Sequence, residues 1–195
     1  AEAYYDYVGV INSLNVKDCV ICDMGGGSFE LAVVVDKEAV SYVSIPYGAV
    51  SLAEKFNAHD KISAQDLFKF YRFVLYKFRQ LPWLLQGTKL PLVLLGGANR
   101  TVARKELMRL GRKDLENIHG VSMSAYSFIE TYTEWLGMDC KERADILGPE
   151  AERADIIIAG LSPIMFLIEY LQTPEIIFSE SGVREGVLYS MLKRK

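Results

Sequence analysis

Apolar residues recur along the chain with two spacings, which separate strands from helices. Runs rich in β-branched residues predict strands at residues 18–24, 28–36, 39–45, 91–95 and 175–179. Apolar residues three or four positions apart predict helices at residues 2–14, 49–57, 64–84, 100–110, 124–136, 139–147, 155–171 and 182–193. The first three strands follow one another closely, so they are expected to form an antiparallel meander.

The order of these elements is a meander, then helices that alternate with two buried strands. A meander that leads into parallel strands with crossover helices gives a mixed α/β sheet. We therefore expect one ribonuclease H-like domain over residues 1–195, with a mixed five-stranded sheet flanked by helices and a helical appendage at about 111–153. Ligands of such sheets bind outside the carboxyl ends of the strands, where Asp23, Gly96 and Ser179 are predicted to lie.

A glycine-rich turn joins the first two predicted strands, with the sequence Asp-Met-Gly-Gly-Gly-Ser-Phe-Glu over residues 23–30. Glycines at 25, 26 and 27 allow positive φ and close approach of a ligand to the backbone. Successive free N–H groups in such a turn bind anions, and Ser28 adds a hydroxyl donor. The turn predicts a phosphate-binding loop; an ordinary glycine-rich hairpin is the alternative. No Gly-Lys-Ser/Thr follows, so it is not a Walker A loop.

Two acids flank this turn. Asp23 ends the first strand, where it is placed to hold a cation or a water beside a bound anion. Glu30 follows Ser28 by two residues, so both are expected on the same side of the second strand. The carboxylate of Glu30 could hold magnesium or a water in that position. The alternative is that Glu30 is an ordinary strand residue exposed to solvent. Glu2, on the first turn of the first helix, carries no weight by itself.

A second small-residue turn, Gly96-Gly97-Ala98, lies between a buried strand and a helix. N–H groups at the start of that helix are suited to a phosphate or a sugar, and Arg100 would add a bidentate phosphate contact. Close packing of the strand against the helix explains the small residues equally well.

The charge and amino-acid composition of the chain limit the kinds of partner that it is expected to bind. The net charge is −3 and the isoelectric point about 5.5, which argues against nucleic acid and membrane surfaces as partners. No apolar run has the length of a membrane span, and no signal peptide is visible. Three cysteines suit a reducing cytoplasm, and Cys19 and Cys22 are expected on opposite faces of one strand, not in a redox or zinc site.

Taken together, these motifs resemble those of the exopolyphosphatase/guanosine pentaphosphate phosphatase family, within the actin-like ATPase superfamily. The turn at 23–30 is similar to that family's second phosphate loop, with Phe29 in place of a threonine. Gly-Gly-Ala-x-Arg at 96–100 is similar to Gly-Gly-Thr-x-Arg, with alanine in place of threonine. The other matching segments are Glu2-Ala3, 46–50, 152–157 and 182–186.

The resemblance implies that water attacks the terminal phosphate of polyphosphate or of guanosine pentaphosphate. It implies Glu2 as general base and Asp23 and Glu30 as the residues that organise Mg²⁺, or another divalent cation, and water. Gly25, Gly26, Gly27 and Ser28 would bind phosphate, as would Gly96, Gly97 and Arg100. Members of the family carry a preceding domain of the same fold. We therefore expect this chain to be the second domain of a two-domain phosphatase, inactive alone.

Two other functions stay open. One is the ATP-binding domain of a sugar-kinase-like or chaperone-like protein, which would need a larger adenosine pocket around residues 96–99. The other is a non-catalytic module that binds a guanosine tetra- or pentaphosphate alarmone and forms a homodimer through Tyr4, Tyr5 and Tyr7.

Overall fold

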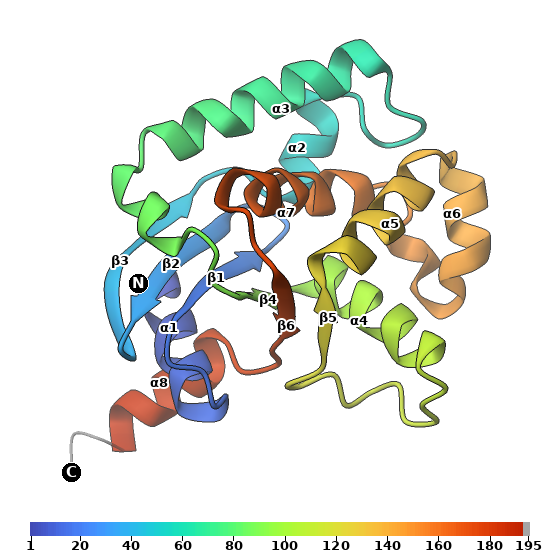
Figure 1. Cartoon of the computed structure of the whole chain (residues 1–195). Coiled ribbons are helices and arrows are strands. Elements are labelled where there is room, and N and C mark those ends of the chain that lie inside the picture. The colour runs from blue at the N-terminus through green and yellow to red at the C-terminus, as the bar shows by residue number, and fades with distance from the viewer. Residues whose placement is uncertain (193–195) are drawn as a thin grey trace.

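A six-stranded sheet runs through the computed structural model of this chain, which describes residues 1–192 (Figure 1). The strands lie in the order β3-β2-β1-β4-β6-β5. Their bounds are β1 (Cys19–Met24), β2 (Phe29–Val35), β3 (Glu38–Ile45), β4 (Leu92–Leu95), β5 (Ser122–Ser124) and β6 (Glu175–Phe178). The sheet is mixed, as the sequence predicts, because a three-stranded antiparallel meander is joined through β1 to the parallel strands β4 and β6.

Strand direction gathers several loops at one edge of the sheet. Because β1, β4 and β6 are parallel, their carboxyl ends meet there. The β1–β2 turn is at the same edge, and β3 ends there opposite the start of β2. We call this the carboxyl edge; it comprises the turn 25–28, the β3–α2 junction 46–48, the β4–α4 junction 96–97 and the segment 179–182.

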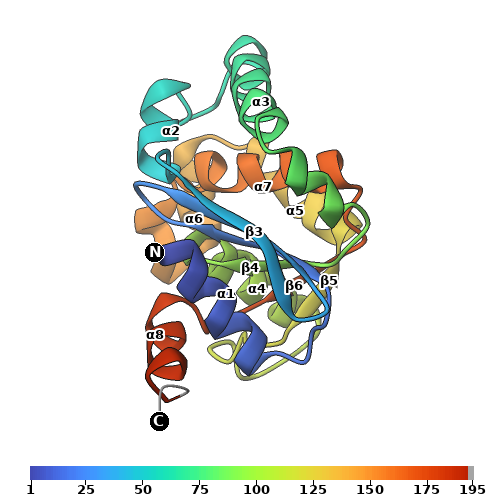
Figure 2. The same cartoon turned by 90° about the vertical axis from the view of Figure 1, so that its left-hand side faces the viewer.

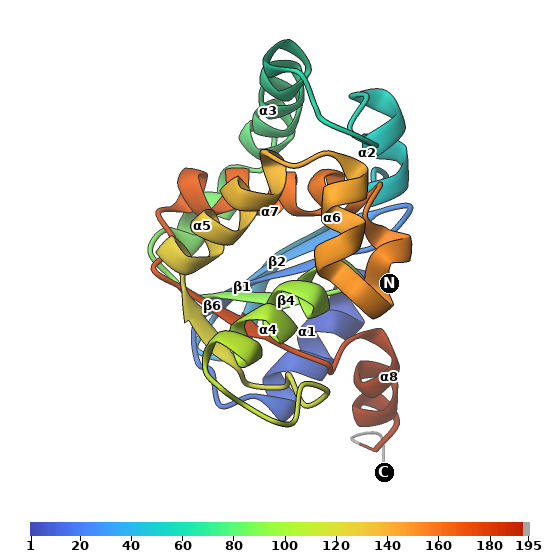
Figure 3. The ribbon, with the colours of Figure 1, turned by 90° about the vertical axis from the view of Figure 1, so that its right-hand side faces the viewer.

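Helices cover both faces of the sheet. They are α1 (Glu2–Ser13), α2 (Ala49–Lys55), α3 (Ala64–Arg79), α4 (Gly97–Arg109), α5 (Ala125–Leu136), α6 (Cys140–Leu147), α7 (Ile157–Leu171) and α8 (Val183–Leu192). Figure 2 shows α1 and α8 on one face and α2, α3 and α7 on the other. Figure 3 shows α4, α5 and α6 grouped on the side of the molecule away from β3.

Alternate side chains of β1 pack into two separate hydrophobic cores, one on each face of the sheet. Val20, Cys22 and Met24 face the larger core, which includes residues of α2, α3, α4, α5 and α7. Cys19 and Ile21 face a smaller core under α1. Cys19 and Cys22 face different cores, so the prediction that they lie on opposite faces of the strand is confirmed, and both are free and buried.

Two glycines let α1 and α8 pack closely. A Cβ at Gly9 would lie 2.6 Å from the carbonyl oxygen of Gly182, and one at Gly186 would lie 1.9 Å from that of Tyr5. Side chains at either position would push the helices apart. The closing helix, predicted over 182–193, is described from Val183 to Leu192; residue 193 lies outside the described residues.

The structure corrects the predicted elements in two places. The sheet has six strands, not five: β5 is only three residues long, and Ser-Met-Ser carries no apolar run that would predict it. The helix predicted over 64–84 ends at Arg79, and the short 3₁₀ helix η1 (Pro82–Gly87) follows. Pro82 supplies no N–H for a continuing helix and disfavours helical geometry at Leu81.

The segment predicted as a helical appendage, 111–153, contains β5, α5, α6 and the 3₁₀ helix η2 (Gly148–Arg153). Within residues 1–192, no single helix is long and apolar enough to cross a membrane. Cys140–Arg153 and Ile157–Leu171 meet that length and composition test only as a pair, across a bend of 94°.

Candidate functional site

Sheet register places two of the predicted acids side by side at the carboxyl edge. Asp23 on β1 pairs directly with Glu30 on β2, and Glu30 pairs with Ser44 on β3. The hydroxyl of Ser44 donates to Glu30 Oε1 at 2.6 Å, and that of Ser28 donates to the same oxygen at 2.8 Å. Ser28 and Glu30 therefore share one side of the strand, as predicted, and two hydroxyl groups fix the carboxylate.

A third acid completes this group from helix α1. Side chains at 19, 21 and 23 alternate toward the α1 face of β1, and there Asp6 approaches the two strand acids. One oxygen from each of Asp6, Asp23 and Glu30 lies within 4.8 Å of the others. We call these three residues the carboxylate cluster. Asp6 is 1% exposed, and neither of its carboxylate oxygens has a hydrogen-bond partner among the described residues.

Burial and mutual repulsion keep this cluster from ionising fully. Desolvation, followed by the charges of Asp23, Glu30 and Glu2, raises the pKa of Asp6 to about 8. Desolvation, followed by the charges of Glu30 and Glu2, raises the pKa of Asp23 to about 6. Near neutral pH, Asp6 therefore retains its proton unless a positive charge enters the cluster.

The glycine turn beside the cluster offers free amides. The N–H of Gly25 donates to the carbonyl of Ser28 at 3.0 Å, so this amide closes the turn. The amides of Gly26, Gly27 and Ser28 have no backbone partner within residues 1–192. Three successive unpartnered N–H groups in a turn make a concave anion site.

Helix α2 holds the turn in this conformation. The amides of Ala49 and Val50 donate to the carbonyls of Gly25 and Gly26, at 2.9 and 3.1 Å. A Cβ at Gly48 would lie 2.3 Å from the backbone of Gly26, so only glycine allows this approach. With both carbonyls directed to α2, the following amides are left for a ligand.

The expectation of positive φ at Gly25, Gly26 and Gly27 is wrong. Within residues 1–192, positive φ among glycines occurs only at Gly96, Gly111, Gly120 and Gly148. A Cβ at Gly27 would meet no atom within 4 Å, and one at Gly26 would make only ordinary contact with Val50. Neither backbone strain nor crowding within the chain therefore requires glycine at 26 and 27, and its effect is to leave space above the turn.

The second small-residue turn packs against the first. Gly96 has φ +99°, and a Cβ there would lie 2.3 Å from the carbonyl oxygen of Met24 and 3.0 Å from Asp23 Oδ1. A Cβ at Gly97 would lie 2.2 Å from Nη1 of Arg153. Close packing against the backbone thus requires glycine at 96 and brings the start of α4 against Asp23, whereas the missing side chain at 97 leaves room for the Arg153 guanidinium.

These segments enclose a cavity of about 170 Å³ at the carboxyl edge. Arg153 is half-buried and makes no ion pair with an acid of residues 1–192. The cavity therefore has free cationic and N–H donors on its walls. Its lining residues are Asp23, Met24, Gly25, Gly26, Ala49, Gly96, Gly97, Ala98, Arg153, Ile156 and Ile157.

The remaining predicted residues lie at different distances from this cavity. Glu2 is exposed on the first turn of α1, one turn before Asp6, and its charge contributes to the raised pKa of Asp23. Glu2 is therefore near the cluster. Arg100 is exposed on α4 and does not line the cavity.

Sequence reasoning missed Asp6 and Arg153. Asp6 shares the buried side of α1 with Ala3 and Val10, and an acid at that spacing was the available signal. Arg153 comes from η2, and no local pattern connects it to the glycine turns.

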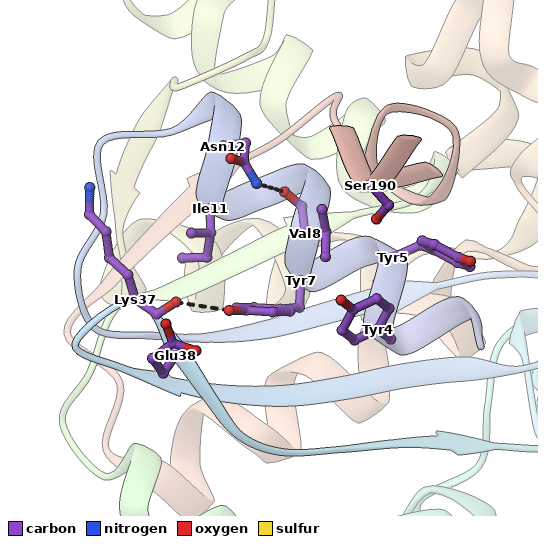
Figure 4. Close-up of a pocket in the computed structure, with 9 residues that line it drawn as sticks. All are labelled: Tyr4, Tyr5, Tyr7, Val8, Ile11, Asn12, Lys37, Glu38 and Ser190. Atoms are coloured by element: carbon purple, nitrogen blue, oxygen red, sulfur yellow. Dashed lines mark hydrogen bonds between the residues drawn. The ribbon is translucent and has the colours of Figure 1, made fainter. Parts of the chain in front are cut away.

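A separate, tyrosine-lined cavity of about 500 Å³ lies between α1, α8 and the β2–β3 turn (Figure 4). The hydroxyl of Tyr7 donates to the carbonyl of Lys37 at 2.9 Å, and the ring of Tyr4 packs against Tyr5, Tyr7 and Tyr42. Tyr4 is 40% exposed, whereas Tyr5 and Tyr7 are half-buried. The homodimer through these tyrosines stays a prediction.

Comparison with solved structures finds the same fold. The chain superposes on a Ppx/GppA protein from Aquifex aeolicus with a TM-score of 0.83 and 26% identity, over 98% of this chain and 62% of that one. It superposes on an exopolyphosphatase from Cytophaga hutchinsonii with a TM-score of 0.85 and 24% identity, over 99% of this chain and 63% of that one. The order of elements predicted a ribonuclease H-like domain, and the mixed sheet flanked by helices is thus an actin-like ATPase domain, as the family resemblance implied.

Sequence comparison finds curated relatives that are longer. The chain is 27% identical over its whole length to 30% of a bifunctional 3-dehydroquinate synthase/phosphatase from Fusobacterium nucleatum. It is 27% identical over 98% of its length to 37% of a guanosine-5'-triphosphate,3'-diphosphate pyrophosphatase from Vibrio cholerae. The chain spans about a third of the length of these relatives. Residues 1–195 match the Ppx/GppA phosphatase family, and the chain belongs to it.

Proposed function

We propose that this chain forms one half of a phosphohydrolase that removes the terminal phosphate of polyphosphate or of guanosine pentaphosphate. The observation that carries the proposal is the meeting of free amides and acids at the carboxyl edge. Phosphoryl transfer needs donors to hold the phosphate and charge to neutralise it, with little covalent chemistry from the protein. Membership of the Ppx/GppA phosphatase family supports the same reaction.

The phosphate would be held by donors on two sides. The free amides of Gly26, Gly27 and Ser28 form one side, and the half-buried Arg153 guanidinium beside the start of α4 forms the other. Gly25 would act by closing the turn, because its own N–H is already bonded to Ser28. Gly96 and Gly97 would act by allowing β1, α4 and Arg153 to lie close together.

Glu2 would take the proton of the attacking water. It is exposed on the first turn of α1, so water reaches it, and it is close enough to the cluster to raise the pKa of Asp23. A positioned carboxylate in this role contributes about 10²- to 10⁴-fold to a rate. Glu30 is buried and Asp23 half-buried, so water reaches them less readily than it reaches Glu2.

Asp23 and Glu30 fit a hard divalent cation such as Mg²⁺. Both offer carboxylate oxygens, the ligands that Mg²⁺ prefers, and they lie opposite each other on adjacent strands. Two like charges in that position need a neutralising partner, and none of the ion pairs within residues 1–192 involves them. A bound Mg²⁺ would neutralise charge on the phosphate oxygens.

We further propose that the other half of the site comes from a preceding domain of the same protein. The chain spans only 30% and 37% of the two curated relatives described above. The cavity at its own carboxyl edge is small, at about 170 Å³. We therefore expect residues 1–195 to fold alone and to release little or no phosphate.

Phosphate release from polyphosphate and guanosine pentaphosphate tests the proposal. The two-domain protein should hydrolyse at least one of them, the chain alone should not, and Glu2→Gln should lower turnover in the two-domain protein about 10²- to 10⁴-fold. Robust hydrolysis by the chain alone would refute the two-domain arrangement. Calorimetric titration separates the alternatives: tight ATP binding with no phosphate release favours a kinase-like or chaperone-like domain, and alarmone binding without hydrolysis favours a regulatory module.

A further inference from the structure

Asp6 has no role in the function proposed so far, yet it is the most deeply buried acid of the carboxylate cluster. It is 1% exposed, and both its oxygens lack a hydrogen-bond partner within residues 1–192. The chain packs tightly around it: a Cβ at Gly182 would lie 3.1 Å from Asp6 Oδ1. An unpartnered carboxylate in such a place costs stability, so a compensating interaction is expected.

No side chain of residues 1–192 supplies that interaction. The ion pairs of residues 1–192 include no Lys, Arg or His bonded to Asp6, Asp23 or Glu30. The Val183 amide faces Asp6, but without a hydrogen bond of normal geometry. Two further acids, Asp23 and Glu30, each place an oxygen within 4.8 Å of an oxygen of Asp6.

The spacing of the cluster matches the coordination sphere of a divalent cation. One oxygen from each acid lies within 4.8 Å of the others. Ligands on opposite sides of Mg²⁺ are about 4.2 Å apart, and those on opposite sides of Ca²⁺ are about 4.8 Å apart. A single ion between the three carboxylates would therefore need only small movements of the side chains.

We infer that Asp6 is a third carboxylate ligand of the divalent cation, so that this chain binds the cation before any phosphate arrives. The inference rests on the proposed placement of the cation at Asp23 and Glu30. Sites with one or two carboxylates commonly need substrate phosphate to complete Mg²⁺ binding. A third, buried carboxylate removes that need, because it adds one negative charge and a ligand fixed by helix packing.

Binding of Mn²⁺ alone tests this role by electron paramagnetic resonance, which distinguishes free from bound ion. The wild-type chain should bind one Mn²⁺ without phosphate, and Asp6→Asn should weaken binding at least about tenfold, or 1.4 kcal/mol. Glu38→Gln is the matched control: it removes the same charge from an exposed residue at the other end of β3 and should bind Mn²⁺ like the wild type.

Thermal unfolding measurements show whether weak Mn²⁺ binding by a variant reflects loss of a ligand or failure to fold. In EDTA at pH 8, Asp6→Asn should unfold at a higher temperature than the wild type, because it replaces the unpartnered buried carboxyl group with an amide that cannot ionise. Added Mn²⁺ should raise the unfolding temperature of the wild type and leave that of Asp6→Asn nearly unchanged. Asp6→Ala, which introduces no new donor, should behave like Asp6→Asn toward Mn²⁺.

Other outcomes separate this inference from the proposed function. Equal Mn²⁺ affinity in the wild type and both Asp6 variants would overturn the role of Asp6 and leave Asp23 and Glu30 in place. Binding of Mn²⁺ by the wild type only when inorganic pyrophosphate is present would also overturn it, while supporting the phosphate site. If the wild type bound neither Mn²⁺ nor pyrophosphate, that result would contradict both the role of Asp6 and the proposed phosphate site.

Discussion

Arg143 and Asp6 are both buried ionisable side chains, each 1% exposed, but their surroundings differ completely. Arg143, on α6, donates to four backbone carbonyls: Ala154 at 2.8 Å, Met138 at 2.6 Å, His59 at 3.2 Å and Asp60 at 3.1 Å. Asp6 has no partner within residues 1–192 and faces two more acids.

This difference indicates that Arg143 stabilises the fold, whereas Asp6 is available to bind a ligand. Arg143 joins α6 to the α2–α3 loop and to the segment before α7, and Ala154 in that segment follows Arg153 directly. Its burial is compensated within the protein. The burial of Asp6 is not, and buried groups without compensation are concentrated at functional sites.

The largest expected effect is on turnover. In the two-domain protein, Glu2→Gln should lower kcat about 10²- to 10⁴-fold, because it removes the proposed general base. Its free energy of unfolding should change by less than about 0.5 kcal/mol, since Glu2 is exposed. Phosphate release and chemical denaturation measure the two effects. Normal kcat in this variant would remove Glu2 from the mechanism.

Arg143→Met should cause the largest loss of stability, about 3 kcal/mol, because four carbonyls lose a charged donor. Urea denaturation of the variant measures it. Arg72→Met on α3 is the control, since Arg72 is exposed and should tolerate the change within about 0.5 kcal/mol. Equal stability of the two variants would show that the buried guanidinium does not hold the fold.

Asp6→Asn should change stability in the opposite direction from Arg143→Met: it should stabilise the fold. The pKa of Asp6 is about 8 in the folded chain against 3.8 for an ordinary aspartate, so the unfolded state loses its proton first. Stability contributed by this group is therefore complete below about pH 4 and is lost as the pH rises toward 8. In EDTA, the wild type should lose stability over this range.

The Asn variant should remove most of that slope and be more stable than the wild type at pH 8, by about 1–2 kcal/mol. Urea denaturation at several pH values measures both. Parallel pH profiles for the two proteins would mean that Asp6 does not carry an uncompensated charge.

The smallest expected effect is on substrate binding. Arg153→Ala in the two-domain protein should raise KM about tenfold, or 1.4 kcal/mol, by removing a cation from the phosphate cavity. Arg153→Lys should recover part of that loss, because lysine keeps the charge but not the bidentate geometry. An unchanged KM in both variants would place Arg153 outside the site, despite its position over Gly97.

The strands and the pair Asp23–Glu30 could be predicted because their signals are local. Apolar runs mark the buried strands, and a hairpin pairs residues on either side of its own turn. The edge strand β5 could not be predicted, because three residues with one apolar side chain are too few to show the alternating pattern of a strand. The 3₁₀ segment after α3 was missed because its apolar spacing continues past Arg79 and hides the effect of Pro82.

The site itself was only half accessible to sequence reasoning. Asp6 and Arg153 reach the carboxyl edge through tertiary packing, one from α1 and the other from η2. Sequence spacing cannot give those contacts. The glycines at 96 and 97 differ from each other. Backbone packing explains Gly96, whereas a Cβ at Gly97 would meet the flexible end of Arg153, the proposed phosphate-binding cation.

The most direct test of the account follows backbone amides by ¹⁵N–¹H NMR while tripolyphosphate and Mg²⁺ are titrated into the chain. We expect the largest shifts at Gly26, Gly27 and Ser28, whose amides are free, and little change at Gly111, which follows the far end of α4 and does not line the cavity. Unchanged signals from Gly26, Gly27 and Ser28, or shifts confined to the tyrosine-lined cavity, would contradict the assignment of the carboxyl edge as a phosphate site.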